Sequence, residues 1–126
     1  MDFSGRTAIV TGGAKGIGRE CCVLLAKHGA RVVIADMNLA GARAVEEELC
    51  GAGDAARAVQ VDVSSVREVR AMAAFAAETF GGADILINNA GIMHTTPIEE
   101  ITEREWDDFM NINLKSVFFA TQAVLP

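Results

Sequence analysis

Short apolar runs rich in β-branched residues alternate along this chain with segments of helical pattern. The runs lie at residues 6–11, 31–36, 56–63 and 83–88. They are apolar almost throughout, so they predict strands covered on both faces, as in a parallel sheet. Helices that supply this cover are predicted at 17–28, at 39–49, between Ser65 and Gly81, and from Thr102 toward the C-terminus.

This alternation predicts a single α/β domain, residues 1–126, built on a Rossmann-type doubly wound parallel sheet. Crossovers between parallel strands are right-handed. We therefore expect the strand order 3-2-1-4, with the first two helices on one face and the later two on the other. The pairs Ser65 with Glu68 and Thr102 with Glu105 have the spacing of capping boxes, which marks the starts of the last two helices.

The segment TGGAKGIG, Thr11 to Gly18, falls between the first strand and the first helix. Backbone amides at a helix N-terminus are unpaired and carry partial positive charge. Glycines allow an anion to approach these amides closely, so a phosphate group is the expected occupant. The segment does not match the P-loop of ATP- and GTP-binding proteins. Close packing of strand against helix is the alternative explanation for one or two of the glycines.

Polar residues also follow the second and fourth strands. Asp36 ends the second strand, 18 residues after Gly18, which is the position of a carboxylate that binds the ribose of NAD. Asn88 and Asn89 follow the fourth strand beside the first, at the switch point where doubly wound sheets bind ligands. The alternatives are a solvated acid at a strand end and two turn-forming asparagines.

Three motifs together resemble the short-chain dehydrogenase/reductase family over essentially the whole chain. They are TGGAKGIG at 11–18, Asp62-Val63 after the third strand, and NNAG at 88–91. The resemblance implies NAD(P)-dependent hydride transfer between an alcohol and a carbonyl compound. It implies cofactor-binding roles for Thr11, Gly12, Gly13, Lys15, Gly16, Ile17, Gly18, Asp36, Asp62, Val63, Asn88, Asn89, Ala90 and Gly91.

The resemblance also implies which part of the cofactor each of these residues contacts. The glycine segment would hold the pyrophosphate and the nearby ribose, and Asp36 would hold the adenosine ribose. Asp62 and Val63 would flank the adenine. Residues 89–91 would line the cofactor ribose, with Asn88 partly tying the sheet together.

The segment NINLKS, residues 111–116, matches the part of the family that contains a catalytic asparagine. Asn113 is the match, because Leu114, Lys115 and Ser116 follow it as the motif expects; Asn111 is the weaker candidate. In the family this residue kinks the helix and holds a water for proton relay. The alternative is a helix-distorting asparagine without chemistry.

The remaining catalytic residues of the family are a Ser and a Tyr-x-x-x-Lys that lie further along the chain. This sequence contains no tyrosine. We therefore expect the cofactor-binding part of an oxidoreductase, truncated before those residues and inactive alone. The first alternative is a non-catalytic dinucleotide-binding module or pseudoenzyme subunit. A flavodoxin- or receiver-like domain is disfavoured, because the first strand ends in Thr11-Gly12-Gly13 without clustered acids.

The sequence also predicts which cofactor is preferred and which partners bind. Asp36 suits a ribose diol but repels a 2′-phosphate, which predicts NAD over NADP. The helix from Trp106 to Leu125 is apolar on two sides, which predicts a helix–helix interface and a homodimer or homotetramer in the full-length protein. The expected substrate is a small-molecule alcohol or carbonyl compound.

Composition excludes several other classes. The net charge is −6 and no basic stripe is present, which argues against a nucleic-acid partner. No apolar run approaches the roughly 20 residues of a membrane span. The three cysteines have neither a disulfide framework nor the spacing of a metal site, and the N-terminus has no leader pattern. We therefore expect no metal and a cytoplasmic location.

Overall fold

The computed structural model describes all of residues 1–126. Its strands are β1 (Thr7–Thr11), β2 (Arg31–Asp36), β3 (Ala56–Gln60) and β4 (Ile85–Ile87). Its α-helices are α1 (Gly16–Lys27), α2 (Leu39–Gly51), α3 (Val66–Phe80), α4 (Glu103–Phe109) and α5 (Ser116–Val124). A 3-10 helix, η1 (Ile98–Glu100), precedes α4, and a π-helical turn, η2 (Met110–Lys115), joins α4 to α5.

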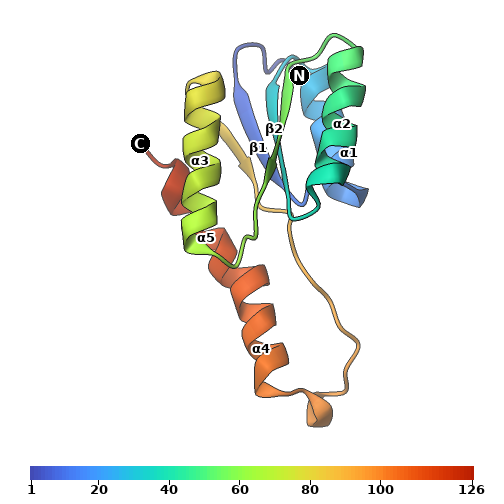
Figure 1. Cartoon of the computed structure of the whole chain (residues 1–126), viewed down its shortest axis with the longest axis vertical. Coiled ribbons are helices and arrows are strands. Elements are labelled where there is room, and N and C mark those ends of the chain that lie inside the picture. The colour runs from blue at the N-terminus through green and yellow to red at the C-terminus, as the bar shows by residue number, and fades with distance from the viewer.

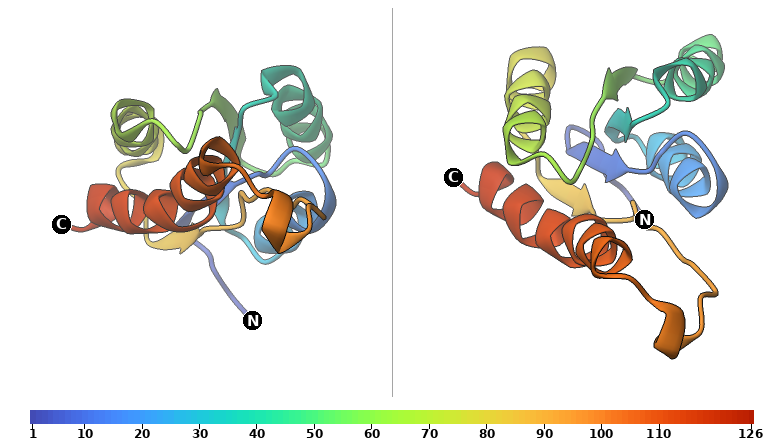
Figure 2. Two further views of the ribbon diagram at one scale, coloured as in Figure 1. Left: turned by 90° about the horizontal axis from the view of Figure 1, so that it is seen from below. Right: turned by 60° about the horizontal axis from the view of Figure 1, so that its bottom comes forward.

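The strands form one parallel sheet in the order β3-β2-β1-β4, which confirms the predicted topology. Helices α1 and α2 cover one face, and α3 and α5 cover the other (Figure 1). Seen from the end, the sheet lies between these two helical layers (Figure 2). The predicted division of the helices between the two faces is therefore also confirmed.

Successive residues of β1 and β2 point to opposite faces of the sheet. Ile9 and Val33 pack in the core under α3 and α5, whereas Val10 and Ile34 pack under α1 and α2. All four side chains are fully buried. Burial of each contributes about 1.5–3 kcal/mol to folding, so the two central strands anchor both halves of the core.

Three strands are shorter than predicted: β1 begins one residue later, at Thr7, and β3 and β4 each lose three residues. β3 ends at Gln60 rather than at residue 63, because the Asp62 carboxylate accepts hydrogen bonds from the amide (2.9 Å) and hydroxyl (2.6 Å) of Ser64 and turns the chain. β4 covers only Ile85–Ile87 and pairs with β1 alone. Past it, the Asn89 amide donates to Thr11 Oγ1 at 3.0 Å rather than continuing the strand ladder.

The long helix predicted after Thr102 is divided in its middle by the π-helical turn, which contains Asn113, the residue at which the family resemblance implies a kink. A π turn holds more residues than an α turn, so the 3.6-residue pattern does not run through it. Beyond the turn, Ala120 and Val124 pack in the core with Phe119. Trp106 remains 59% exposed.

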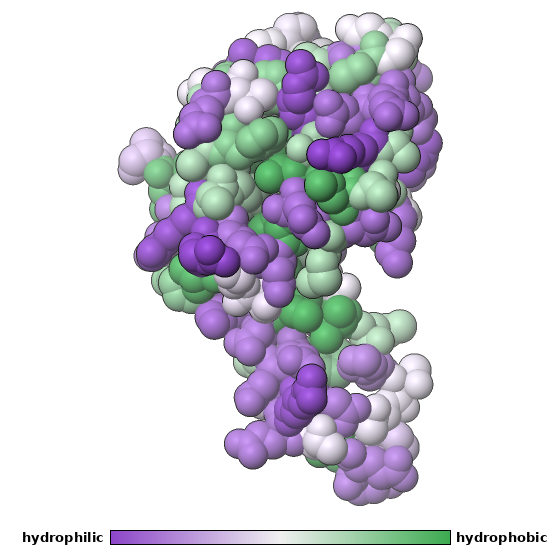
Figure 3. Space-filling model, in the orientation of Figure 1, coloured by the Kyte–Doolittle hydropathy of each residue, from purple (hydrophilic) through white to green (hydrophobic).

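The loop after β4 and α4 extend beyond the carboxyl ends of the strands as an arm, residues 92–109 (Figures 1 and 2). The Thr102–Glu105 capping box is fully formed at the start of α4. Glu105 also accepts a hydrogen bond from the Thr96 hydroxyl at 3.0 Å, which holds the loop against the helix. Most of the arm surface is hydrophilic, and hydrophobic residues gather where it joins the body (Figure 3).

Candidate nucleotide-binding cleft

A cleft of about 420 Å³ opens at the carboxyl ends of β1, β2 and β4, at the switch point of the sheet. Its lining includes most of the residues that the sequence predicts. The lining residues are Gly12, Lys15, Gly16, Ile17, Ala35, Asp36, Met37, Val61, Asp62, Val63, Asn89, Ala90, Gly91, Ile92 and Ile112. Thr11, Gly13, Gly18, Asn88 and Asn113 are predicted site residues that do not line it.

The N-terminus of α1 faces this cleft with free backbone amides. Lys15 is the N-cap residue, but no side chain caps the helix and its first turn contains no acidic residue. The first amides of a helix have no intrahelical acceptor and carry partial positive charge. Gly12 (φ +66°) and Gly16 (φ +55°) have backbone conformations that favour glycine, and a Cβ at Gly16 would meet only open space. The turn can therefore receive an anion.

Gly13 and Gly18 shape the turn from behind. A Cβ on Gly18 would lie 2.1 Å from the Gly12 carbonyl oxygen, and one on Gly13 would lie 2.9 Å from Ile34 Cγ2. The packing explanation raised from the sequence therefore holds for these two glycines. Both still contribute to the site, since they let α1 approach β1 closely enough to set the turn.

Thr11 and Asn89 join the glycine turn to the segment after β4. The Thr11 hydroxyl accepts hydrogen bonds from the amides of Asn89 (3.0 Å) and Ala90 (3.1 Å). The Asn89 side-chain amide donates to the carbonyl oxygens of Thr11 (3.0 Å) and Gly12 (3.2 Å). The tie expected of Asn88 is thus made by Asn89. Asn88 is exposed and lies in a separate groove at the free edge of β4.

The Asp36 carboxylate is held by backbone amides on both sides. One oxygen accepts from Ala14 N at 3.0 Å, in the glycine turn, and the other accepts from Asn38 N at 2.9 Å. Asn38 in turn caps α2 by accepting from Gly41 N at 3.0 Å. Asp36 therefore fixes the relative position of the glycine turn and the start of α2 while lining the cleft.

Five apolar residues of the cleft are absent from the site residues predicted from the sequence. They are Ala35, Met37, Val61, Ile92 and Ile112. Each is adjacent in sequence to a polar residue that was singled out or matches a family motif, and this adjacency is the only signal that marks them. Met37 is 58% exposed for a large hydrophobic side chain, which leaves it free to cover a flat apolar ligand group at this end of the cleft.

Asn113 lies in the π-helical turn, behind the cleft wall. Its side-chain oxygen accepts from Ile92 N and its side-chain nitrogen donates to Ile92 O, both at 2.8 Å. The side chain thus holds the loop after β4 by two hydrogen bonds. Because Ile92 and Ile112 both line the cleft, Asn113 positions two parts of its wall.

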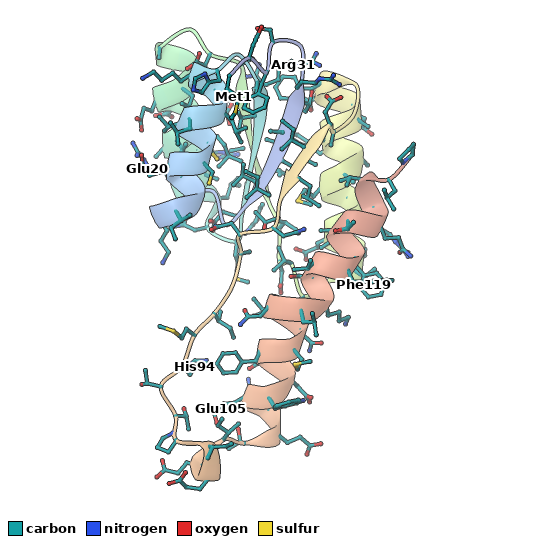
Figure 4. The ribbon with its side chains drawn as sticks, turned by 180° about the vertical axis from the view of Figure 1, so that it is seen from behind. Met1, Glu20, Arg31, His94, Glu105 and Phe119 are labelled. Atoms are coloured by element: carbon teal, nitrogen blue, oxygen red, sulfur yellow. The ribbon has the colours of Figure 1, made fainter.

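Two other titratable side chains, His94 and Cys22, are engaged in packing within the fold. His94 packs edge-on against Phe109 with ring centroids 5.2 Å apart, and both lie in the arm (Figure 4). Burial raises the pKa of the Cys22 thiol to about 12, so this cysteine is inert at neutral pH.

No group of three or more His, Cys, Asp or Glu side chains is placed to hold a metal ion. None of the helices combines the length and apolar character needed to cross a membrane.

A family model described as short chain dehydrogenase matches residues 6–126. The chain belongs to this family. It is similar to 3beta-hydroxysteroid dehydrogenase 2 of Eggerthella lenta, with 41% identity over 95% of this chain and 46% of that protein. It is also similar to sorbitol dehydrogenase of Cereibacter sphaeroides, with 40% identity over 98% of this chain and 47% of that protein. The flavodoxin- or receiver-like alternative is thereby set aside.

Solved structures of short-chain dehydrogenases agree in fold. A hydroxysteroid dehydrogenase from Escherichia coli superposes with a TM-score of 0.94 at 35% identity, covering 98% of this chain and 52% of that chain. This chain spans about half the length of the curated relatives that it matches. The short-chain dehydrogenase family uses a nicotinamide dinucleotide cofactor, and the uncapped glycine turn of α1 and the apolar end of the cleft fit its phosphates and its adenine.

Proposed function

We propose that this chain forms the cofactor-binding part of an NAD(P)-dependent oxidoreductase that transfers hydride between an alcohol and a carbonyl compound. The observation that carries the proposal is the uncapped N-terminus of α1, which faces the same cleft as the Asp36 carboxylate. Free amides suit a pyrophosphate and a carboxylate suits a ribose diol. Few other ligands need both groups at opposite sides of one turn.

The chain's residues divide as the family resemblance implies. The amides at 16–18 and the backbone of Gly12 would hold the pyrophosphate. Asp62 and Val63 would flank the adenine, and residues 89–91 would hold the second ribose. To these the cleft lining adds Met37, which would cover the adenine from the end of β2. When bound, the nicotinamide ring accepts or donates the hydride. The role of these residues is to bind and orient the cofactor and to exclude water from it.

We propose that NAD is preferred over NADP. Asp36 carries a negative charge at the position where NADP would place its 2′-phosphate, and both of its oxygens are fixed by backbone amides. Neither Met37 nor Asn38 brings a positive charge, although Lys15 lines the adjoining hollow. Repulsion between fixed like charges costs binding free energy.

Asn113 is proposed to contribute to proton relay through its place in the π turn, where its side chain is committed to Ile92. The chain has no tyrosine to serve as the general acid and base. We therefore propose that residues 1–126 alone bind the cofactor without turning over substrate. The names of the relatives, a hydroxysteroid and a sorbitol dehydrogenase, favour a secondary alcohol or its ketone as substrate.

Assembly and location complete the proposal. Exposed apolar side chains on α4, η2 and α5 form one set, which comprises Trp106, Met110, Leu114, Val117 and Phe118. We propose that a second copy covers this set in a homodimer or homotetramer. All three cysteines are free thiols, in keeping with the proposed reducing cytoplasm.

The test is an assay of the full-length protein with NAD and NADP against a panel of secondary alcohols, and with NADH against the matching ketones. Turnover with NAD that exceeds turnover with NADP supports the proposal. Binding of NAD without turnover of any alcohol or ketone would favour the alternative of a non-catalytic dinucleotide-binding module. Absence of binding to either cofactor would contradict both.

A further inference from the structure

The sheet has two outer strands, β3 and β4, and their free edges are built differently. An unpaired strand edge presents N–H and C=O groups that recruit strands of other chains unless something blocks them. At the β3 edge, side chains from two helices reach the outward backbone groups. The only strand that pairs with β4 is β1, and no side-chain hydrogen bond reaches Ile85.

The direction of each backbone group in β3 follows from its bonds to β2. Val32 N donates to Ala55 O at 2.8 Å, and Val61 N donates to Asp36 O at 3.1 Å. In a parallel pair alternate residues turn their backbone groups toward the partner. Residues 55, 57, 59 and 61 therefore face β2, and residues 56, 58, 60 and 62 face outward.

Two of the outward N–H groups are held by carboxylates. Ala58 N donates to Glu46 Oε2 at 2.7 Å, and Glu46 projects from α2. Asp62 N donates to Glu68 Oε2 at 2.7 Å, and Glu68 projects from α3. The helices on both faces thus each place one carboxylate at the edge of the strand that they flank.

The outward carbonyl of Ala56, two residues before Ala58, is also occupied. Ala56 O accepts from Arg57 Nη1 at 2.7 Å and from the Cys50 thiol at 3.5 Å. Arg57 Nη1 lies 3.9 Å from the second Glu46 carboxylate oxygen. Glu46 and Arg57 together therefore cover neighbouring donor and acceptor positions, which are the ones an added strand would use.

We propose that Glu46 closes the β3 edge against strand addition by a second copy of this chain. Pairing of two β3 edges needs the Ala58 amide, and Glu46 holds that amide in a charge-assisted hydrogen bond. Glu46 is only partly exposed and is anchored on a regular helix, so the cap is placed by the fold.

The full-length wild-type protein offers the first test, by hydrogen exchange at single amides. Ala58 and Gln60 both face outward on β3, but only Ala58 is capped by a carboxylate. After correction for intrinsic rates, the Ala58 amide should exchange at least about tenfold more slowly than that of Gln60. Equal rates would overturn the proposal.

Variants give the second test. Glu46→Ala removes the acceptor and the charge, and Glu46→Gln keeps an acceptor. Glu47→Ala removes the same charge from an exposed neighbour whose side chain forms no hydrogen bond or ion pair. Glu46→Ala should raise Ala58 exchange at least about tenfold and raise the weight-average mass in sedimentation at matched concentration. Glu47→Ala should behave as wild type, and Glu46→Gln, which keeps an acceptor without the charge, should fall between wild type and Glu46→Ala.

The remaining outcomes are decisive as well. Faster Ala58 exchange in Glu46→Ala with an unchanged mass would overturn the edge-closing role, and an equal rise in mass for Glu47→Ala would assign the effect to net charge. Circular dichroism checks that each variant is folded. Should Glu46→Ala fail to fold, the wild-type comparison of Ala58 with Gln60 decides the question.

Discussion

Single backbone positions set the shape of the glycine turn. Gly18 lies where α1 crosses the Gly12 carbonyl, with no room for a side chain. Asp36 then links this turn to the start of α2 through two amides. The site is therefore fixed by close backbone approach and by one carboxylate, and small changes at these residues should have large effects.

Gly18→Ala tests the close approach. A Cβ 2.1 Å from the Gly12 oxygen forces α1 away from β1, so the variant should lose about 1–3 kcal/mol of unfolding free energy and bind NAD more weakly. Urea denaturation and NAD titration measure the two effects. Gly51→Ala is the control, because a Cβ there meets nothing within 4 Å; it should be neutral or slightly stabilising. Similar stability of the two variants would show that the contact is relieved easily.

At the scale of elements, the arm depends on Glu105. Hydrogen bonds from the Thr102 amide and from the Thr96 and Thr102 hydroxyls lower the pKa of this carboxyl from its ordinary value of 4.5. A depressed pKa in the folded state means that the charged form is the one the fold favours. The stabilisation of the folded state by ionised Glu105 is thus fully present above the ordinary pKa of 4.5. It is lost as the pH falls through the lower pKa that the carboxyl has in the folded state.

Glu105→Gln should therefore loosen the arm at neutral pH. Amides of residues 96–105 should exchange faster than in wild type at pH 7, and the difference should shrink as the pH is lowered below 4.5. Glu103→Gln is the control, since Glu103 shares the first turn of α4 but makes no side-chain hydrogen bond. If the two proteins still differed as much in amide exchange below pH 4.5, the charge of Glu105 would not be what holds the arm.

For the whole molecule, the exposed apolar side chains of α4, η2 and α5 are the proposed contact with a second copy. Phe119 points into the core with α3, whereas Phe118 is 63% exposed. Phe118→Glu should therefore lower the mass of the full-length protein in light scattering without unfolding it. Phe119→Glu would disturb the core and is the less informative change. An unchanged mass for Phe118→Glu would place the interface elsewhere.

The free edge of β4 leads to a second prediction at this scale. Its three residues, Ile85–Ile87, are apolar and pair on one side only. Expressed alone, residues 1–126 should be marginally stable and self-associating, and should show no dehydrogenase activity. Mass, thermal unfolding and turnover of secondary alcohols measure this. A monomer with a sharp transition would contradict the edge argument, and turnover would place the general base within these residues.

The sequence predicted the topology and most of the cleft, because apolar strands and a glycine turn are strong local signals. The resemblance implied a kink at Asn113, but the helical pattern did not predict a π turn, since periodicity assumes regular α-helix throughout. The bonds of Asn113 to Ile92, 21 residues earlier, also have no local signal. From the sequence we expected Asn88 to link β4 to the rest of the sheet, whereas the side chain of Asn89 makes that link. Two adjacent asparagines cannot be told apart from the sequence, because the backbone of the turn decides which side chain points toward β1. Long-range partners such as Glu46 with Ala58 have no local pattern.

The central claim is that the glycine turn and Asp36 bind NAD in preference to NADP. Calorimetric titration of the full-length protein with each cofactor tests it most directly, alongside Asp36→Ala and the distant control Asp54→Ala. NAD should bind wild type at least about tenfold more tightly than NADP. Asp36→Ala should narrow that ratio and Asp54→Ala should not. Equal or tighter binding of NADP to the wild-type protein would contradict the account.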